Sequence, residues 1–250
     1  KQAIAKEMQE NMYSASLKTF GSQTADVMAL DLGLVPAGDE KAVAKSVVLN
    51  MNEKSNGFMH CGIFGIGRIG SMLARNGNSQ AAWNMFTKKG EGSFAQMWDA
   101  ADATSLWEEL PINAASKKDA AEASHNHPMQ AGYDVCFYED IAGIHPDASG
   151  YGFKVIRFQP MFTENLSWAK GSIESPYGTV VSDWKQQNGL LDWKISIPAN
   201  SSGMVALPKK GNVTVNGNVL DEKKYLPVRS EGEFMLYRFP SGVFNIHEKK

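Results

Sequence analysis

The spacing of apolar residues changes period once along this chain, near Pro146, and that change constrains the fold more than any other feature. Before Pro146, apolar residues recur every three or four positions, which is the period of an amphipathic helix. After it, short runs alternate apolar and polar side chains, which is typical of half-buried strands. The sequence therefore predicts an α part followed by a β part.

The first part predicts an array of antiparallel helices. Short periodic segments are separated by loops rich in Gly, Asn and Ser, as in helix-loop-helix arrays. Asp39, after Pro36 and Gly38, is the expected N-cap of the first strong segment. The expected helices are Asp39–Lys54, a segment containing Ile66–Ala74 that ends before Gly77, Gln80–Lys89 and Pro128–Gly143.

The second part predicts an antiparallel sandwich or barrel. Turn signals separate the runs at Tyr177-Gly178, Asn188-Gly189 and Asn216-Gly217. The junction holds Pro, Gly and Ser, so we expect one domain over residues 1–148 and another over residues 149–250. The expected strands are Phe153–Gln159, Leu166–Glu174, Thr179–Lys185, Trp193–Ile197, Met204–Leu207, Val213–Val215 and Phe234–Phe239.

Charge and composition exclude several classes of protein. The 25 Lys and Arg residues nearly balance the 27 Asp and Glu residues, giving a net charge of −2. We therefore expect neither nucleic acid nor an anionic membrane surface as a partner. No apolar run approaches the roughly 18 residues of a membrane helix, and two cysteines cannot staple a disulfide-dense scaffold.

A glycine pattern at Gly65-Ile-Gly67-Arg-Ile-Gly70 matches the dinucleotide-binding fingerprint. Glu91 lies at about the right distance, but no strand precedes it to carry it to a ribose, and no βαβ alternation follows. We therefore interpret these glycines as sites of close helix packing. An NAD-dependent oxidoreductase remains only a remote alternative.

Two other motifs hold residues that could bind a metal or act as a nucleophile. His125-Asn-His127 could share a metal with a third ligand from His60, Cys61 or His145, but no metal-type spacing links these residues. We interpret the imidazoles as hydrogen-bonding loop residues, or as side chains that grip a polar substrate, and expect no metal or other cofactor. Cys61 and Cys136 are expected to be small buried hydrophobes rather than nucleophiles.

The stretch from Trp98 to Glu109 interleaves aromatic rings with carboxylates. Rings stack on the apolar face of a pyranose, and carboxylates bind its hydroxyls or transfer protons. The alternative is a helix start with acidic residues near its positive end. Composition alone leaves both interpretations open.

Taken in order, several motifs resemble the C-terminal part of the bacterial α-L-rhamnosidases, a family of inverting glycoside hydrolases. The resemblance covers nearly the whole chain, and the ordered set is more specific than any one motif. The motifs are Asp31–Pro36, Gly62–Gly65, Thr104–Glu108, Ser124–Pro128 and Ile141–Ile144, followed in the β part by Leu166–Lys170, Ser175–Gly178 and Ile197–Asn200.

This resemblance implies a multidomain chain, a partial (α/α)6 barrel followed by an antiparallel β-sandwich, that acts on rhamnose-containing glycosides. Glu108 matches the family's general base, which activates water, and His127 matches a histidine that contacts rhamnose. Trp107 and Asn126 flank these residues and are expected to shape the site. Neighbouring Glu109 is a rival for the base, but its position in the motif favours a solvated charge.

The family's general acid lies upstream of the matching region, so we expect this chain to be a C-terminal fragment whose partner is the remainder of the same polypeptide. The family's substrates imply a periplasmic or extracellular location. The alternative is a non-catalytic carbohydrate-binding or structural piece. In either case Trp168, Trp184 and Trp193 of the β part are expected to be core residues.

Overall fold

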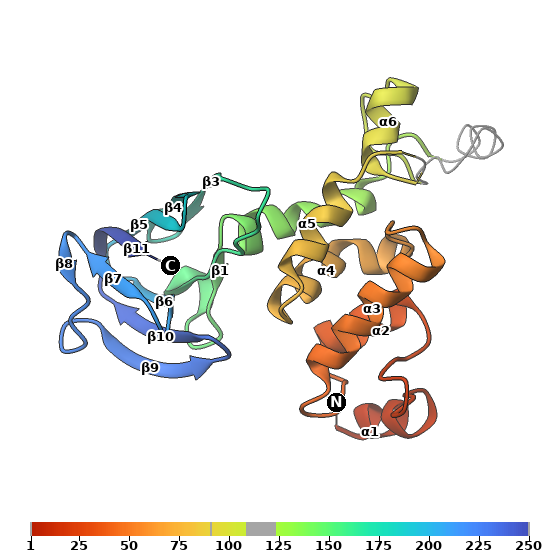
Figure 1. Cartoon of the computed structure of the whole chain (residues 1–250), viewed down its shortest axis with the longest axis horizontal. Coiled ribbons are helices and arrows are strands. Elements are labelled where there is room, and N and C mark those ends of the chain that lie inside the picture. The colour runs from red at the N-terminus through yellow and green to blue at the C-terminus, as the bar shows by residue number, and fades with distance from the viewer. Residues whose placement is uncertain (1, 91, 109–123, 250) are drawn as a thin grey trace. The chain divides into compact units, whose positions relative to one another are not determined.

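The computed structural model describes residues 2–90, 92–108 and 124–249. The chain divides into two compact units, Lys1–Cys136 and Phe137–Lys250. The first unit is helical and the second is built from strands, so the predicted order of an α part and a β part is confirmed (Figure 1).

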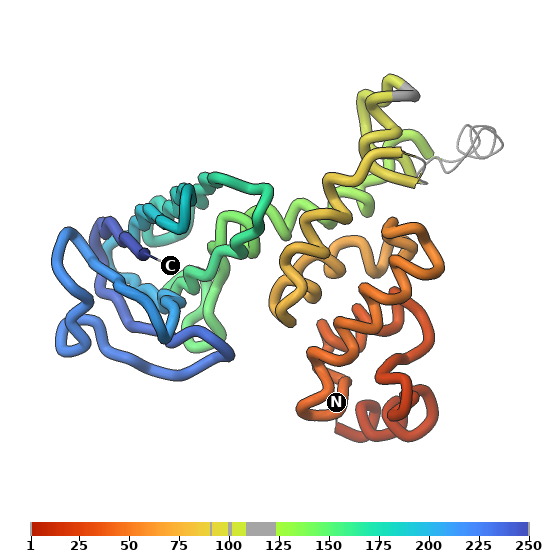
Figure 2. Tube along the Cα trace, viewed as in Figure 1, coloured from red at the N-terminus to blue at the C-terminus, as the bar shows by residue number. Residues whose placement is uncertain are grey.

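The helical unit runs back and forth as short helices joined by tight loops (Figure 2). Helix α2 packs against α3 and α4, and α4 also packs against α5 and the segments that follow residue 127. The helices are α1 (Gln2–Asn11), α2 (Gln23–Leu32), α3 (Glu40–Lys54), α4 (Gly62–Arg75), α5 (Ser79–Thr87), α6 (Phe94–Ala101) and α8 (Asp134–Cys136).

Helix α3 begins where its sequence predicts, but Asp39 does not cap it through its side chain. The Asp39 carboxylate instead accepts hydrogen bonds from Tyr13 Oη at 2.8 Å and Lys18 Nζ at 2.9 Å. These partners are more than 20 residues away in the sequence, so local pattern could not reveal them. Val43 and Val47 are fully buried, as the three-to-four-residue spacing of apolar residues in a helix predicts.

The glycine pattern lies inside helix α4, where it permits close packing. A Cβ atom on Gly67 would lie 3.2 Å from the backbone oxygen of Gly132, and one on Gly70 would lie 2.6 Å from the Phe86 ring. A phosphate-binding loop needs these glycines between a strand and a helix. Their position within α4 supports the packing interpretation instead.

The expected continuous α-helix over Pro128–Gly143 is wrong. The segment is a 3-10 turn, η1 (Pro128–Tyr133), then α8, then a π-helical turn, η2 (Phe137–Ile141). Pro128 starts η1 at its first position, where a missing N–H costs nothing. The change of helix type shifts the angular position of each side chain, which a 3.6-residue period cannot describe.

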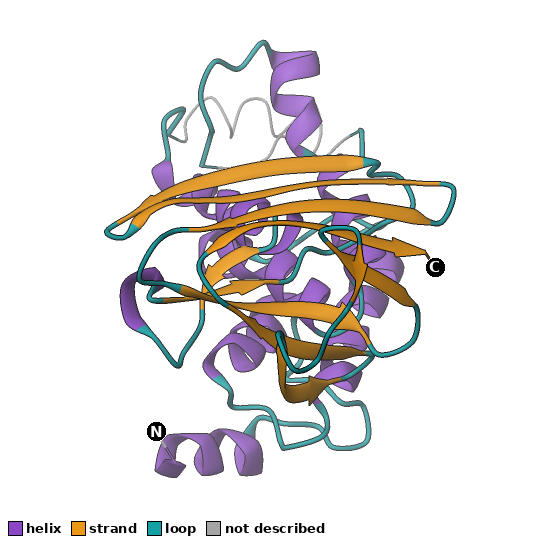
Figure 3. Ribbon diagram, turned by 90° about the vertical axis from the view of Figure 1, so that its left-hand side faces the viewer, coloured by secondary structure: helices purple, strands orange, loops and turns teal. Residues whose placement is uncertain are grey.

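The second unit contains two sheets (Figure 3). A five-stranded sheet has the order β1-β2-β6-β10-β9, and a six-stranded sheet has the order β3-β4-β5-β11-β7-β8. The strands are β1 (Ile144–Pro146), β2 (Val155–Phe158), β3 (Trp168–Ser175), β4 (Gly178–Gln187), β5 (Leu190–Ile197), β6 (Ser202–Pro208), β7 (Asn212–Val215), β8 (Asn218–Val219), β9 (Leu226–Glu231), β10 (Phe234–Phe239) and β11 (Gly242–Lys249).

The core of this unit lies between the two sheets. Phe158 of one sheet meets Trp193 of the other with ring centroids 6.5 Å apart. A Cβ atom on Gly203 would lie 2.6 Å from Ile197 Cδ1, so the sheets approach closely there. All seven predicted strands are confirmed, and the pairs are antiparallel except β2 with β6, which is parallel.

The sandwich tryptophans divide into two groups. Trp184 and Trp193 are buried, as predicted. Trp168 is 59% exposed, so the expectation that it belongs to the core is wrong. Its strand β3 is an edge of the six-stranded sheet, and an edge strand has neighbours on one side only.

Candidate functional site

The candidate site in the helical unit is formed by two backbone segments that pair with each other. The Glu108 N–H donates to the Ser124 carbonyl at 2.9 Å, and the His127 N–H donates to the Leu106 carbonyl at 2.9 Å. The pairing brings the Thr104–Glu108 and Ser124–Pro128 motifs side by side. Glu109 and residues 110–123 lie outside the described residues.

Glu108 is half-buried and held at both its main chain and its side chain. Its Oε2 atom accepts a hydrogen bond from the Ser124 N–H at 3.2 Å. Its carbonyl oxygen accepts a hydrogen bond from Gln130 Nε2. A carboxylate has several lone-pair sites, so one fixed donor orients the group and leaves capacity to accept a proton from water.

Trp107 carries a stacked imidazole rather than an open face. Its ring lies parallel to that of His125, with centroids 4.2 Å apart and planes 8° apart. The Ser105 hydroxyl donates to the His125 carbonyl, which ties the same two segments together. Trp107 therefore orders the site, and the ring face that stacks on His125 is not open to a sugar.

Asn126 lies at the exposed tip of the second segment. Its backbone N–H donates to Ser124 Oγ at 3.3 Å. Asn126 is exposed and precedes His127 in the chain, so it is accessible from solvent.

His127 precedes η1 and is half-buried. Its Nε2 atom is buried and has no hydrogen-bond partner among the residues that the structure describes. Gln130 Oε1, one turn later, is also buried and has no hydrogen-bond partner among the described residues. Buried polar atoms normally have partners, so these two atoms, on residues three apart in the chain, require an explanation.

Gln130 is a residue that the sequence interpretation missed. Only 5% of it is exposed, its N–H donates to the His127 carbonyl, and its Nε2 reaches the Glu108 carbonyl. Gln130 thus connects Glu108, through its side chain, with His127, through its backbone N–H. Gln130 lies three residues after His127, the N-cap of η1. A glutamine at this position often forms a hydrogen bond with backbone at the start of the helix, and this was the available signal.

The two candidate cysteines lie outside the paired segments and are buried. Cys61 is 3% exposed, and burial raises the pKa of its thiol to about 12. It is therefore protonated at neutral pH and is a poor nucleophile. Cys136 is also buried.

No metal centre is formed by the described residues. Within residues 2–90, 92–108 and 124–249, no three His, Cys, Asp or Glu side chains are grouped as a metal would require. His145 lies in β1 of the second unit, whereas His60, His125 and His127 lie in the first.

Comparison with known families matches both units of the chain. Residues 1–141 match the bacterial alpha-L-rhamnosidase 6 hairpin glycosidase domain. Residues 143–219 match the bacterial alpha-L-rhamnosidase C-terminal domain. The first match alone covers more than half of the chain.

Individual relatives agree with these matches. An alpha-L-rhamnosidase of Formosa agariphila is 27% identical over 83% of this chain and 21% of its own length. One from Alteromonas sp. is 25% identical over 80% of this chain and 22% of its own length. The chain therefore spans about a fifth of the length of these relatives.

Solved structures share this fold. The alpha-L-rhamnosidase from Dictyoglumus thermophilum superposes with a TM-score of 0.83 and 27% identity, covering 100% of this chain and 28% of that one. The Streptomyces avermitilis enzyme, solved with L-rhamnose, gives a TM-score of 0.82 at 22% identity, covering 98% of this chain and 23% of that one. At that identity the second likeness concerns the fold alone.

Proposed function

The chain belongs to the bacterial α-L-rhamnosidase family, and on that premise we propose that it is the C-terminal part of an enzyme that releases terminal α-L-rhamnose with inversion. The observation that carries the proposal is the pairing of the two motif segments. It holds the Glu108 carboxylate and the His127 turn on adjacent stretches of backbone.

Glu108 is the proposed general base. An inverting hydrolase needs one carboxylate to deprotonate a water and a second carboxyl group to protonate the leaving oxygen. The two are roughly 6.5–9.5 Å apart, which leaves room for that water. We propose that the acid lies in a part of the polypeptide outside this chain and faces Glu108 across the sugar.

His127, Trp107 and Asn126 are the proposed substrate-binding residues. The unpartnered Nε2 of His127 supports this role, because a sugar hydroxyl supplies the hydrogen bond that the described residues do not. Trp107 acts through its stack on His125, which keeps the second segment in place. Asn126 is proposed to contact the substrate from the solvent side.

The remainder of the same polypeptide is the proposed partner of the helical unit. Large apolar side chains stand exposed on its helices, including Phe64 at 68% and Leu49 at 46%. A folded protein rarely leaves such groups in water when a neighbouring segment can cover them. Residues 1–148 are proposed to complete a six-hairpin barrel with that segment, and residues 149–250 to form the closing sandwich.

The substrate class also bears on location. No helix among the described residues is long and apolar enough to cross a membrane. We propose a periplasmic or extracellular enzyme, because rhamnose-containing glycans are met outside the cytoplasm.

Kinetics of the longer protein test the proposed base. Glu108→Gln should lower kcat on an aryl α-L-rhamnoside by roughly 10²–10⁴, since the amide cannot take a proton from water. Glu53→Gln, an exposed residue of α3, is the matched control and should leave kcat unchanged. Near-normal turnover by Glu108→Gln would contradict the proposal and favour the non-catalytic alternative.

A further inference from the structure

The helical unit contains a cleft between helices α3 and α5 that the proposed function does not use. Its volume is about 370 Å³, which lies within the range of small-molecule sites. Both helices contact α4. On α3 the lining residues are spaced i, i+3 and i+4, which places them on one face of the helix. The lining residues are Val48, Met51, Asn52, Gly57, Ala81, Asn84, Met85, Thr87 and Lys88.

One part of the lining is apolar and continuous with the core of the helical unit. Met51 and Met85 are 3% and 5% exposed, and both belong to the buried core cluster. Val48 and Ala81 are half-buried and add to this apolar surface. Methionine side chains are flexible and polarisable, so they adapt to the shape of an apolar group that lies against them. This part of the lining therefore favours a ligand with an apolar body.

Lys88 brings a positive charge to the cleft. The residue is half-buried, and its Nζ atom lies 4.8 Å from the centroid of the Phe58 ring. Within the described part of the chain no carboxylate pairs with Lys88, and none of the nine described lining residues is Asp or Glu. Lys88 lies at the C-terminal end of α5, where the helix dipole contributes only about half a negative charge. The ammonium therefore keeps a net positive charge that can attract an anion.

A second polar group lies near this ammonium, at the turn that follows α3. A Cβ atom on Gly57 would lie 3.2 Å from Lys88 Nζ and 3.7 Å from Asn52 Oδ1. The ammonium and the Asn52 carboxamide therefore converge on the backbone of Gly57. Asn52 is exposed, and its carboxamide forms no hydrogen bond with another described residue. An ammonium and an amide N–H are both donors, and together they suit the two oxygens of a carboxylate.

Charge and polarity together define the ligand. The ammonium favours an anion, and this attraction is stronger in a cleft than on an open surface because the surrounding dielectric is lower. The apolar part of the lining favours ring or chain carbons in the rest of the molecule. We propose that the cleft binds a small monocarboxylate with an apolar body, its carboxylate at Lys88 and Asn52 and its body against Met51 and Met85. This inference does not rest on the proposed hydrolysis.

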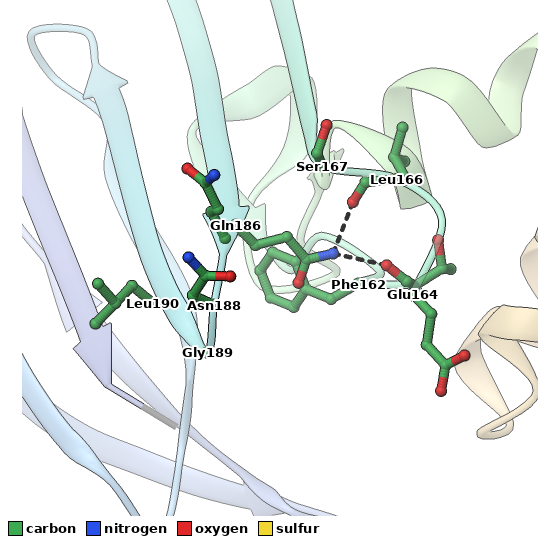
Figure 4. Close-up of a pocket in the computed structure, with 10 residues that line it drawn as sticks. Phe162, Glu164, Leu166, Ser167, Gln186, Asn188, Gly189 and Leu190 are labelled. Carbon is green, nitrogen blue, oxygen red and sulfur yellow. Dashed lines mark hydrogen bonds between the residues drawn. The ribbon is translucent and has the colours of Figure 1, made fainter.

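The second unit has a cleft of similar size, about 340 Å³, beside the turn between β4 and β5 (Figure 4). Gln186 Nε2 donates there to the carbonyls of Thr163 and Leu166, each at 2.7 Å (Figure 4). Among the ten described residues that line this cleft none is Lys, Arg or His. A carboxylate should therefore not select it, and the cleft of the second unit can report non-specific binding.

Two-dimensional NMR of the 250-residue chain tests the site, with benzoate as the probe and benzamide as its neutral counterpart. Benzoate should shift the side-chain amide signals of Asn52 and Asn84 in a saturable way, with a dissociation constant on the order of 1 mM. Benzamide has the same ring without the charge and should bind at least about fivefold more weakly. D-glucuronate is anionic but has a polar body, so it should also bind more weakly than benzoate. The Asn188 amide, at the cleft of the second unit, should not shift.

Substitutions of Lys88 test the role of its charge. Lys88→Met keeps an unbranched side chain and removes the charge, so it should weaken benzoate binding at least about fivefold and abolish the preference over benzamide. Lys88→Arg keeps the charge and should retain that preference. The matched control is Lys89→Met, because Lys89 is exposed, pairs with Asp99 at 3.7 Å and does not line the cleft. This variant should bind benzoate as the parent chain does.

Several results would each overturn the proposal. They are the absence of saturable shifts at Asn52 and Asn84, equal shifts at Asn188, benzamide or glucuronate binding as tightly as benzoate, and equal effects of Lys88→Met and Lys89→Met. Since the readout is binding between α3 and α5, its failure is distinguishable from loss of catalysis at Glu108.

Discussion

Glu108, the proposed general base, illustrates how a carboxylate is positioned by hydrogen bonds that involve the main chain. Its N–H, its carbonyl and its Oε2 each have a hydrogen-bond partner, and two of the three bonds are made with Ser124. The third comes from Gln130, which also bonds the His127 carbonyl through its own N–H. We infer that Gln130 is a positioning residue that acts through Glu108.

Replacing Gln130 should therefore affect turnover more than binding. In the longer protein, Gln130→Met keeps the length of the side chain and removes the donor to Glu108. We expect kcat to fall by about 10²-fold, because a displacement of about 1 Å at a reacting group costs that much, and KM to change much less.

Gln9→Met provides the control for this prediction. Gln9 Nε2 also donates to a backbone carbonyl, that of Leu34 at 2.7 Å, in the same helical unit. Both variants lose a bond of the same kind and should lose about 1 kcal/mol of stability. If Gln9→Met lowered kcat as much as Gln130→Met, the effect would reflect stability and the positioning role would be wrong.

Candidate site residues were predictable where they lie in a short motif. Hydrogen-bond partners that are distant in the sequence were not predictable. The family motifs pointed to Glu108 and His127, whose roles stay proposals. The partners of Asp39 lie more than 20 residues away in the sequence, and the bond from Gln130 Nε2 to the Glu108 carbonyl depends on how two separate segments fold. Trp168 and Trp184 both lie in predicted strands. Trp168 is exposed because its strand, β3, is at the edge of the sheet, whereas Trp184 is buried.

At the scale of elements, the five-stranded sheet is joined across its width by ion pairs. Arg157 of β2 contacts Glu231 of β9, although β6 and β10 lie between these strands in the sheet order. Arg229 of β9 pairs with Glu231 and also with Asp147, which follows β1. These contacts connect the two sides of the sheet through side chains.

This network should make the second unit sensitive to acid. Desolvation by burial acts to raise the pKa of the Asp147 carboxyl. Hydrogen bonds from Ser149 and the charges of Arg229 and Arg157 outweigh it and hold this pKa below the ordinary 3.8. Glu231 is likewise desolvated, yet Arg157 and Arg229 hold its pKa below 4.5. A carboxylate with a lowered folded-state pKa contributes stability above its unfolded pKa and loses it as pH falls through the folded value.

We therefore expect the unfolding free energy of the second unit to drop as pH falls below about 4.5. The part due to this network should be about 1 kcal/mol, since the pairs are partly exposed. Urea unfolding followed by the methyl signals of Ile156 and Ile195 measures it. In Asp147→Asn/Glu231→Gln the acid dependence should flatten, and an unchanged dependence would contradict the role of the network.

Elements were predictable where one period runs unbroken. Burial alternates along strands such as β4 and β5, and the two Asn-Gly turns take the positive φ angles that such hairpins need. The segment from Pro128 to Ile141 was predicted wrongly because three helix types follow one another there. Strands β1, β8, β9 and β11 were not predicted. Strand β8 has only two residues, and β9 is exposed along most of its length. Burial does alternate along β11, so that strand could have been predicted.

At the scale of the whole molecule, the order of a helical unit and a β unit follows from the single change of apolar period. The glycines of α4 illustrate how packing resolves an ambiguous motif, since Gly67 lies against Gly132 and Gly70 against Phe86. The chain spans about a fifth of the length of its curated relatives. This is consistent with our proposal that the acid lies in another part of the polypeptide and faces Glu108 across the sugar.

The central claim is that Glu108 serves as the base of an inverting glycosidase, and an anion that needs no deprotonation tests it most directly. In the longer protein, Glu108→Ala should be nearly inactive on an aryl α-L-rhamnoside. Added azide would attack the anomeric carbon in place of water, displacing the aryl alcohol, which takes its proton from the acid. We predict that azide raises turnover by at least about tenfold and yields β-L-rhamnosyl azide. No response to azide, or a product of retained α configuration, would contradict the account.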